Sequence, residues 1–441
     1  MESVTRAADG AVLPTAGITP RRVGFVSVHT SPLEQPGSGD SGGMNVHMAA
    51  LAGRLTRAGV AIDVFTRATG RDLPPTLVTA DGVRVHHLQA GPAVLPKRDL
   101  ASHLCAFYLA LASHAATPGL DLLHGHYWMS GWVGRQASLR LGLPLVQSFH
   151  TLGRVKNERL APGDRPEPTL RLAAEDRVAA AAHALIAPTT TEVGILRERY
   201  GAAAGQVHLV EPGVDLGVFR ADGDRRAARR ALGGGRIILF VGRLQPLKAP
   251  DLAVRTLAAV DRLLPDDGVP ARLVIVGGPS GDGGGVDPAG LRRLARALGV
   301  EDRVALLAPR PQTDLVGLYQ AADAVIVPSH SESFGLVALE AQACATPVVA
   351  SAVGGLLHVV GDGGGTLVHG RDPESFAAAL VPYLVDPRAR ARAGRNGRRK
   401  AARYDWGRTA AATLEVYRVV TARRGGREAA GGEAPRSLPG A

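Results

Sequence analysis

The sequence predicts an α/β protein made of two doubly wound parallel-sheet domains that face a cleft. Its 441 residues are too many for one hydrophobic core and suit two domains. Short, continuously apolar segments alternate with helical patterns, which is typical of parallel strands covered on both faces. This alternation ends at a turn-rich joint, residues 211–219, and then starts again.

The first series of strands lies in the N-terminal half. Strands are predicted at 22–29 and 60–67, and between them an amphipathic helix at 43–59 ends at Gly59. Further strands are predicted at 122–127, 144–150, 184–189 and 207–212. The first domain therefore spans 22–212.

The second series fills the C-terminal half and defines a domain at 213–403. The segments at both ends of the chain, 1–21 and 423–441, are rich in Gly, Ala, Pro and charged residues, and we expect both to be disordered. Strands are predicted at 236–243, 272–278, 303–309, 324–329 and 347–351.

The net charge of +11 raises the question of a nucleic-acid partner. Much of the excess is local, in the basic run 387–403, and no aromatic residues alternate with the arginines as a base-stacking surface requires. A solvated arginine-rich helix is therefore the favoured interpretation, and anionic small substrates also suit a basic protein. No apolar run is long enough to span a bilayer and no signal pattern opens the chain, so we expect a cytoplasmic protein. The two cysteines, Cys105 and Cys344, have no metal-ligand spacing.

A glycine-rich loop, H-T-S-P-L-E-Q-P-G-S-G-D-S-G-G-M-N-V, follows the first predicted strand and leads into a helix. Gly42 and Gly43 have no Cβ, so a ligand can approach the backbone and the free N–H groups at the helix start. In doubly wound sheets, ligands bind outside the carboxyl ends of the strands, which is where this loop lies.

A second candidate segment, V-G-R-L-Q-P-L-K-A-P, stands at the end of the strand predicted at 236–243. Arg243 offers a forked donor and Lys248 a mobile point charge, a pair that suits a diphosphate. Two solvated cations at a helix start are the alternative interpretation.

The stretch S-E-S-F-G-L-V-A-L-E follows the strand predicted at 324–329 and places two carboxylates around one glycine. Gly335, Leu336 and Val337 offer unpaired N–H groups at a helix N-terminus, which suit an anion. Glu332 lies in the loop before the helix and Glu340 lies inside it. One can accept hydrogen bonds from sugar hydroxyls and the other can reach a ribose diol.

Glu332 and Glu340 also form an E-x7-E motif. Together with V-G-R-x-x-P-x-K and the G-G-M-N-V loop, it makes residues 22–420 resemble the retaining family 4 glycosyltransferases. These enzymes have the GT-B fold of two facing Rossmann-like domains. The resemblance implies a homodimer and a C-terminal helix, at about 407–421, that packs back on the first domain.

Further segments resemble a narrower group within that family: H-x-H-Y-W-x-S-G, H-T-L-x-x-V-K-N and S-E-S-F-G-L-V-A-x-E-A-Q-A-C. Members of this group transfer N-acetylglucosamine from UDP-N-acetylglucosamine to 1D-myo-inositol 3-phosphate with retention, the first glycosylation step of mycothiol biosynthesis. One departure is Gln147, where relatives often carry a second histidine. It precedes the matching His150-Thr151 pair, so we expect acceptor binding to survive.

The resemblance implies a role for each matching residue. His150, Arg243, Lys248 and Glu332 match catalytic positions. The donor-binding positions are Gln35, Pro36, Gly43, Arg243, Lys248, Arg310, Glu332, Gly335, Leu336, Val337 and Glu340. The acceptor-binding positions are His29, Asp40, Ser41, Gly42, Gly43, Met44, Asn45, Lys97, Tyr127, Thr151 and Arg171.

No cofactor is expected for the chemistry, because no D-x-D stands in the segments assigned to the cleft. The resemblance implies a structural Mg²⁺ held by main-chain atoms of Tyr319, Gln320, Ala322 and Thr346. Because no metal is expected at the diphosphate, fixed donors of the protein must stabilise the charge on the departing UDP. No nucleophile is evident on the opposite face, so front-face attack, with the leaving phosphate taking the acceptor proton, is the hypothesis.

Three other functions stay open from the sequence. The first is a family 4 enzyme with another acceptor, similar to sucrose-phosphate synthase. The residues that distinguish it are the acceptor-binding residues Lys97, Tyr127, Thr151 and Arg171. The second is a UDP-sugar epimerase on the same fold, which is distinguished by whether UDP release requires an acceptor. A nucleic-acid-binding protein that uses residues 387–403 shows a steep salt dependence of duplex binding.

Overall fold

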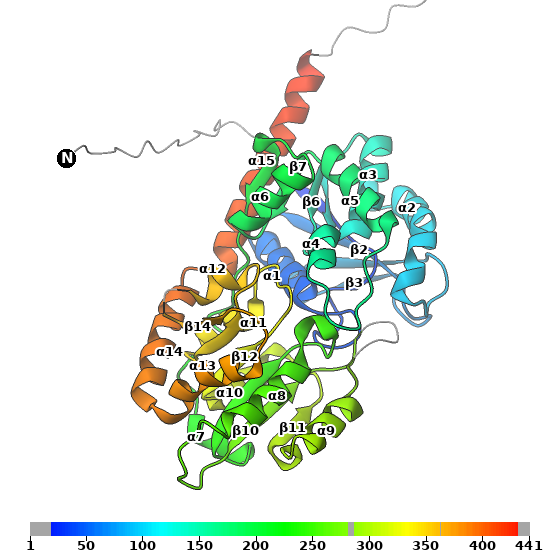
Figure 1. Cartoon of the computed structure of the whole chain (residues 1–441). Coiled ribbons are helices and arrows are strands. Elements are labelled where there is room, and N and C mark those ends of the chain that lie inside the picture. Colours follow the sequence, from blue (N-terminus) through cyan, green and yellow to red (C-terminus); the bar gives the residue numbers. More distant parts are fainter. Residues whose placement is uncertain (1–18, 281–285, 362, 431–441) are drawn as a thin grey trace, which may run out of the picture.

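The computed structural model describes residues 19–280, 286–361 and 363–430, which form two α/β domains stacked on one another (Figure 1). Most of the predicted N-terminal tail and residues 431–441 lie outside the described residues. The prediction for 423–430 is wrong, because helix α15 continues through Ala430.

The N-terminal sheet runs in the order β3-β4-β2-β1-β5-β6-β7-β8. Its strands pair in parallel except for β3, which pairs antiparallel to β4 at one edge. The expected parallel sheet is therefore observed with one antiparallel edge strand. The strands are β1 (Arg22–Ser27), β2 (Ala61–Arg67), β3 (Thr76–Val78), β4 (Arg84–Leu88), β5 (Leu122–His126), β6 (Leu145–Ser148), β7 (Ala184–Ala187) and β8 (Val207–Leu209).

Helices cover both faces of this sheet, so its strands are buried on both sides. One face packs against α2 (Leu104–Ser113), α3 (Trp128–Leu141) and α5 (Thr169–Ala181). The other packs against α1 (Gly43–Arg57) and against α15 (Trp406–Ala430). Two shorter helices complete the domain, α4 (Gly153–Glu158) and α6 (Thr190–Arg199).

The C-terminal sheet is parallel and runs in the order β11-β10-β9-β12-β13-β14. This is the doubly wound order in which the third, second and first strands precede the fourth, fifth and sixth. The strands are β9 (Arg236–Val241), β10 (Ala271–Val276), β11 (Val304–Leu307), β12 (Ala324–Val327), β13 (Val348–Ser351) and β14 (Gly365–Val368).

Two hydrophobic cores also enclose this second sheet. One core is closed by α8 (Pro250–Val260), α9 (Pro288–Ala297) and α13 (Pro373–Val385). The other is closed by α10 (Gln312–Ala321), α11 (Leu336–Ala343) and α12 (Leu356–Val360). Two further helices, α7 (Arg225–Ala231) and α14 (Pro387–Ala401), pack against α10 and α11.

Helix α15 follows the second domain in sequence but packs on the first (Figure 1). Val416, Tyr417 and Val420 are buried in the core of the N-terminal domain. The Tyr417 hydroxyl lies 2.7 Å from Nδ1 of His124, a buried residue of β5. The chain therefore crosses between the domains twice.

In both sheets the strand order reverses beside the first strand, between β1 and β5 and between β9 and β12. Ligands bind at such switch points, outside the carboxyl ends of the strands. The loops after β1, β5, β9 and β12 carry the motifs that the sequence singles out, so the fold gathers them between the domains.

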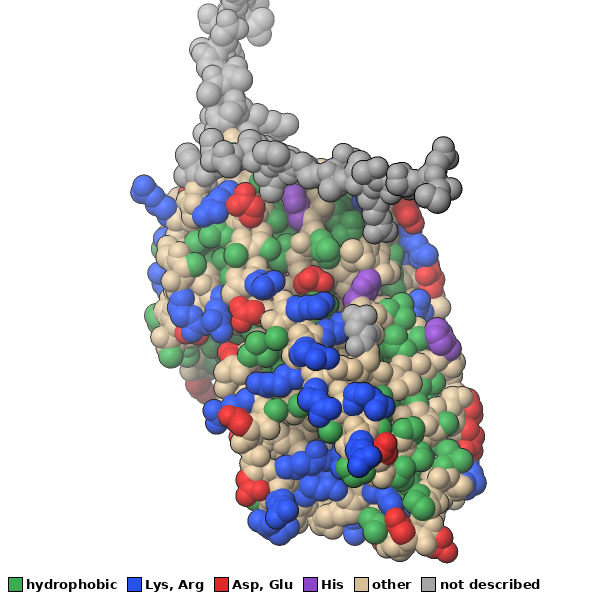
Figure 2. Space-filling view, turned by 90° about the vertical axis from the view of Figure 1, so that its left-hand side faces the viewer, with side chains coloured by type: hydrophobic (Ala, Val, Ile, Leu, Met, Phe, Trp, Pro, Cys, Tyr) green, Lys and Arg blue, Asp and Glu red, His purple; other side chains and the backbone are tan. Residues whose placement is uncertain are grey.

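Helix α14 takes up most of the basic run 387–403. Lys and Arg side chains gather on the face of the molecule shown in Figure 2, and Arg388, Arg392, Arg395 and Arg399 of α14 are exposed. The helix is not a wholly solvated element, since Arg398 Nη1 donates to the Ala343 carbonyl and other basic side chains also turn inward. No helix within the described ranges has the length and apolarity needed to cross a bilayer.

Candidate active site

A cavity of about 1110 Å³ lies between the domains and takes its walls from both of them. The proposed donor and acceptor residues therefore face one shared space. The predicted site residues that line it are His29, Pro36, Asp40, Gly42, Gly43, Met44, Lys97, Tyr127, His150, Thr151, Arg171, Arg243, Lys248, Arg310, Glu332, Gly335, Leu336, Val337 and Glu340.

Gln35, Ser41 and Asn45 do not form part of the cavity wall. The Asn45 side chain is buried, where its Nδ2 donates to Thr30 Oγ1 (2.6 Å) and its Oδ1 accepts from the Gly42 amide (2.9 Å). Ser41 is buried within the same loop. The side chains of these two residues are therefore held within the glycine-rich loop. Gln35 Nε2 reaches the second domain and donates to the Arg310 carbonyl (2.9 Å).

Arg243, directly after β9, reaches across to the glycine-rich loop of the first domain. Its Nη1 lies 3.2 Å from Ser280 Oγ and 3.9 Å from Asp40 Oδ1. A Cβ at Gly42 would lie 3.2 Å from Arg243 Nε, so glycine there leaves room for the guanidinium. Burial lowers the pKa of Arg243, partly offset by Asp40 and Glu332, but a guanidinium stays charged. The loop and the cation form one anion-binding wall.

Lys248, in a short 3₁₀ turn (Pro246–Lys248), forms an ion pair with the carboxylate of Glu332. The Glu332 carbonyl accepts a hydrogen bond from the Gly355 amide (2.8 Å). At Gly354, where φ is +48°, a Cβ would lie 2.0 Å from the Glu332 carbonyl oxygen. The loop before α11 therefore holds its Glu332 carboxylate against the cation inside the cavity.

Helix α11 begins after Gly335, whose φ of +109° only glycine adopts readily. Gly335, Leu336 and Val337 at the start of α11 line the cavity, and a helix N-terminus there suits an anion. Glu340, further along α11, accepts from Tyr319 Oη (2.7 Å) and Gln312 Nε2 (2.9 Å). Burial raises its pKa to about 7, although both hydrogen bonds act in the opposite direction.

The acceptor half of the cavity is organised around Tyr127. The centroid of its ring lies 4.9 Å from Lys97 Nζ and 4.9 Å from Arg171 Cζ. Arg171, fully buried, donates to Tyr127 Oη (3.1 Å) and to Thr151 Oγ1 (3.0 Å). Two cations and two hydroxyls therefore lie around Tyr127 on the cavity wall, donors of the kind that a phosphomonoester binds.

His150, after β6, has a left-handed backbone with φ of +59° and lines the cavity. Its Nε2 lies 2.9 Å from Nδ1 of His126, and its carbonyl accepts from Ser333 Oγ of the second domain (2.5 Å). Burial, with further contributions from His47 and His124, lowers its pKa well below 6.5. The ring is therefore a neutral hydrogen-bonding group at physiological pH.

The expected magnesium site fits the observed residues poorly. The Tyr319 carbonyl already accepts from Thr346 Oγ1 (2.7 Å), and the Ala322 carbonyl accepts from the Arg225 guanidinium (3.3 Å). A guanidinium beside a carbonyl ligand repels a divalent cation. Within the described residues, no cluster of three or more His, Cys, Asp or Glu side chains could hold a metal, and we derive no step through a metal.

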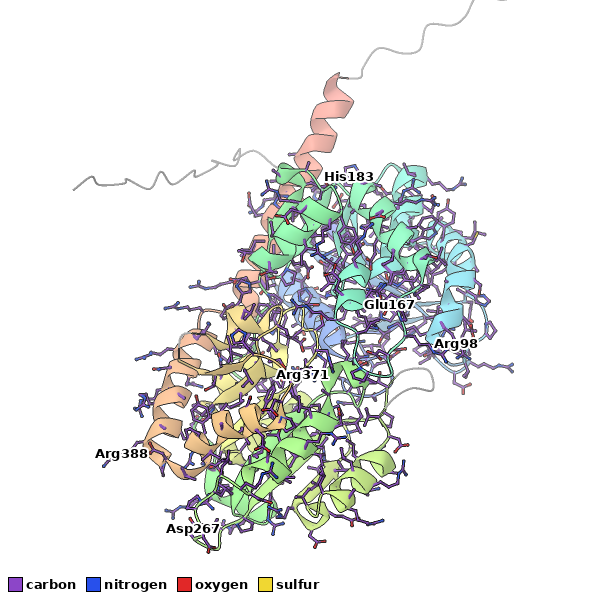
Figure 3. The ribbon with its side chains drawn as sticks, in the orientation of Figure 1. Arg98, Glu167, His183, Asp267, Arg371 and Arg388 are labelled. Atoms are coloured by element: carbon purple, nitrogen blue, oxygen red, sulfur yellow. The ribbon has the colours of Figure 1, made fainter. Side chains whose placement is uncertain are left out.

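Sequence reasoning assigned no role to several residues that face or support the cavity. Lys156 lines the cavity and is the lysine of the H-T-L-x-x-V-K-N segment. This motif therefore marked Lys156 as a candidate site residue. Ser333 and Gln312 contact other predicted site residues, and Glu167 comes from a loop without any motif. In Figure 3, Glu167 lies on the side of the first domain that faces the second.

Two family models match the chain, one in each domain. Residues 42–213 match the glycosyl transferase 4-like domain, and residues 224–400 match the glycosyl transferases group 1. The two matches cover both sides of the cavity.

Relatives extend these matches over most of the chain. The D-inositol 3-phosphate glycosyltransferase 2 of Catenulispora acidiphila is 52% identical over 406 residues, covering 90% of this chain and 95% of that protein. The D-inositol 3-phosphate glycosyltransferase of Acidothermus cellulolyticus is 51% identical over 414 residues, covering 92% of each.

Solved structures share the arrangement of the two domains. Sucrose-phosphate synthase from Thermosynechococcus elongatus superposes with a TM-score of 0.81 and 32% identity, covering 90% of this chain and 98% of that one. Anabaena Alr3699/HepE, solved in complex with UDP and glucose, superposes with a TM-score of 0.72 at 21% identity and covers 90% and 99%. The sequence-based assignment to a two-domain glycosyltransferase fold is confirmed.

Proposed function

This chain belongs to the glycosyltransferase family that includes the D-inositol 3-phosphate glycosyltransferases, and we propose that it transfers N-acetylglucosamine from UDP-N-acetylglucosamine to 1D-myo-inositol 3-phosphate with retention. This reaction is the first glycosylation step of mycothiol biosynthesis. The observation that carries the proposal is one cavity lined by cations from both domains, Lys97 and Arg171 from the first and Arg243 and Lys248 from the second. The names of the relatives support the acceptor.

On the donor side, Arg243, Lys248 and the N-terminus of α11 bind the diphosphate. Arg243 is always charged, and its buried position makes its interaction with a phosphate stronger than it would be in water. Lys248 is already paired with Glu332, so an incoming diphosphate frees this carboxylate to accept hydrogen bonds from hydroxyls of the transferred sugar. Glu340 accepts from the ribose, and Arg310 presents its backbone to the uracil.

On the acceptor side, the phosphate of the inositol binds Lys97, Arg171, Tyr127 and Thr151. These side chains line the cavity, are linked through Tyr127 and Arg171, and provide charged and hydroxyl donors. Charge-assisted hydrogen bonds of this type are roughly twice as strong as neutral ones. The phosphate therefore fixes the polyol, and the neutral His150 lies between the two substrates.

In the proposed reaction, the bond from the anomeric carbon to the UDP oxygen breaks as the acceptor hydroxyl attacks from the same face. The acceptor proton passes to the departing phosphate oxygen, and the charge that develops there is stabilised by Arg243 and Lys248. Fixed donors aimed at a developing anion are usually the largest contribution to catalysis. Trapping of a covalent glycosyl-enzyme adduct with a slow donor would contradict this route.

The decisive experiment is UDP release from UDP-N-acetylglucosamine in the presence of inositol 3-phosphate, free inositol or fructose 6-phosphate. We expect rapid release with inositol 3-phosphate and little with the other two. Lys97→Met should raise KM for the acceptor and spare the donor, whereas Arg243→Met should lower kcat by about 10²- to 10³-fold. Faster release with fructose 6-phosphate would favour the acceptor of sucrose-phosphate synthase instead.

The resemblance also implies a homodimer, and the sequence predicts a cytoplasmic protein; we include both in the proposal. Sedimentation analysis of the purified chain tests the dimer. The alternative of nucleic-acid binding through α14 predicts a steep salt dependence of duplex binding, and we expect only weak attachment.

A further inference from the structure

A pair of charged residues beside the acceptor cations has no role in the proposed reaction. Lys156 of α4 forms an ion pair with the carboxylate of Glu167, which lies in the loop before α5. The second oxygen of Glu167 lies 3.0 Å from Nη1 of Arg171. Lys156 and Glu167 both line the cavity, so a carboxylate of the protein occupies Arg171, one of the two cations assigned to the acceptor phosphate.

The backbone around Glu167 is fixed independently of its side chain. The Glu167 amide donates to Asn157 Oδ1 (2.7 Å), and Asn157 Nδ2 donates to the Glu167 carbonyl (3.4 Å). Asn157 is the neighbour of Lys156 on α4. The carboxylate can therefore rotate away from Arg171 while these backbone hydrogen bonds stay in place. Displacement by a ligand then needs no rearrangement of the loop backbone.

Glu167 is not needed to compensate the charge of Arg171. Glu175, fully buried, accepts hydrogen bonds from Arg171 Nε (2.7 Å), the Gly153 amide and Tyr200 Oη. This second carboxylate therefore also compensates the charge of the guanidinium. Burial raises the pKa of Glu167, but Arg171 and Lys156 outweigh this effect and the pKa lies below its ordinary value. Glu167 is thus ionised, and its charge is matched by Lys156.

Resting on the proposed function, we propose that Lys156 is a further ligand of the acceptor phosphate and that Glu167 is an internal anion which this phosphate displaces from Arg171. A phosphomonoester carries about 1.5 to 2 negative charges at pH 7, more than the carboxylate it replaces. A polyol without phosphate carries none and cannot displace it. The Lys156–Glu167 pair therefore contributes to selection of phosphorylated acceptors.

The test compares Glu167→Gln and Lys156→Met by acceptor KM and by calorimetric affinity for inositol 3-phosphate. Glu167→Gln removes the competing charge and keeps the shape, so we expect KM to fall about three- to tenfold, with discrimination against free inositol reduced. Lys156→Met should raise the same KM about tenfold, comparable to loss of one charge-assisted hydrogen bond. KM for the UDP-sugar should stay unchanged in both variants.

The matched control is Glu158→Gln, which neutralises an exposed carboxylate on the same helix as Lys156. It should leave both KM values unchanged. A rise in acceptor KM for Glu167→Gln would overturn the proposal, because Glu167 would then support acceptor binding. An unchanged KM in Lys156→Met would equally contradict a role for Lys156, and Lys156→Arg, which keeps the charge, should retain near-normal KM.

Inorganic phosphate separates this proposal from the proposed function. If inositol 3-phosphate failed to bind the unmodified protein, the proposed acceptor would be wrong. Displacement of Glu167 would still predict that Glu167→Gln binds inorganic phosphate several-fold more tightly and Lys156→Met more weakly. Equal phosphate affinities in all three proteins would refute the displacement.

Discussion

Two residues that follow neighbouring strands of the first domain, Tyr127 and His150, adopt left-handed backbone conformations with φ of +78° and +59°. Residues other than glycine adopt such conformations at a cost of about 1–3 kcal/mol, and they cluster at functional sites. Gln147, buried beneath them, donates to the Tyr127 carbonyl (3.1 Å). The departure from the family pattern at Gln147 therefore supports the unusual backbone that turns Tyr127 toward the cavity.

At the residue scale, Glu340 predicts a pH dependence of donor binding. Its pKa of about 7 in the unliganded protein means that it is largely protonated at pH 6 and ionised at pH 8. If the carboxylate accepts from the ribose, affinity for UDP-N-acetylglucosamine should rise with pH across this window, by up to about tenfold. Calorimetry with the intact UDP-sugar measures this, since its diphosphate does not titrate there.

Glu340→Gln serves as the control for that experiment. The amide cannot ionise, so its affinity should be weaker at pH 8 and should vary little with pH. An unchanged pH profile in Glu340→Gln would assign the dependence to another group in the cavity, such as a histidine.

The sequence predicted the site residues whose side chains have distinctive chemistry at strand ends, among them Arg243, Lys248 and Glu332. Their position follows from local rules, because the carboxyl ends of parallel strands meet at one edge. Glu167 could not be found in this way, since its contact with Arg171 depends on how the loop before α5 crosses the cavity. Ser41 and Asn45, which the resemblance assigns to the acceptor, are buried and do not line the cavity.

At the scale of secondary-structure elements, the strands that were not predicted from the sequence lie at or next to sheet edges. β3, β4 and β14 stand at or next to the ends of their sheets. Edge strands are covered less completely, so they need not be continuously apolar, and β4 reads R-V-H-H-L. The central strands were predicted because burial on both faces demands an apolar run.

Because α15 packs on the first domain, we predict that the Tyr417 hydroxyl on this helix contributes to stability. Its hydroxyl is bonded to His124 in a fully buried position, so Tyr417→Phe leaves the imidazole with an unpaired nitrogen. The expected cost is about 1–3 kcal/mol of unfolding free energy. Urea unfolding followed by circular dichroism measures this cost.

Tyr108→Phe, on α2, provides a comparison at a half-buried tyrosine and should change stability by less than about 0.5 kcal/mol. Equal stability of Tyr417→Phe and the unmodified protein would show that the contact between α15 and β5 depends on apolar packing alone.

At the scale of the whole molecule, direct hydrogen bonds join the domains across the cavity. The Gly278 amide donates to the Gly37 carbonyl (2.9 Å), and Thr191 Oγ1 lies 3.0 Å from His358 Nε2. Ser333 Oγ donates to the carbonyl of His150. The two domains are therefore in direct contact, and the E-x7-E segment touches the backbone of a residue proposed to act on the substrates.

Closure and catalysis can be separated through two of these contacts. Ser333→Ala removes the bond to His150, and Thr191→Val removes a contact between the domains that does not involve His150. Each loses one hydrogen bond, worth about 0.5–1.5 kcal/mol, so both should shift the unliganded protein toward an open form detectable by small-angle X-ray scattering. Only Ser333→Ala should also lower kcat, by about three- to tenfold, because the left-handed backbone of His150 loses its support. Equal losses of kcat in both variants would mean that Ser333 acts through closure alone and does not position His150.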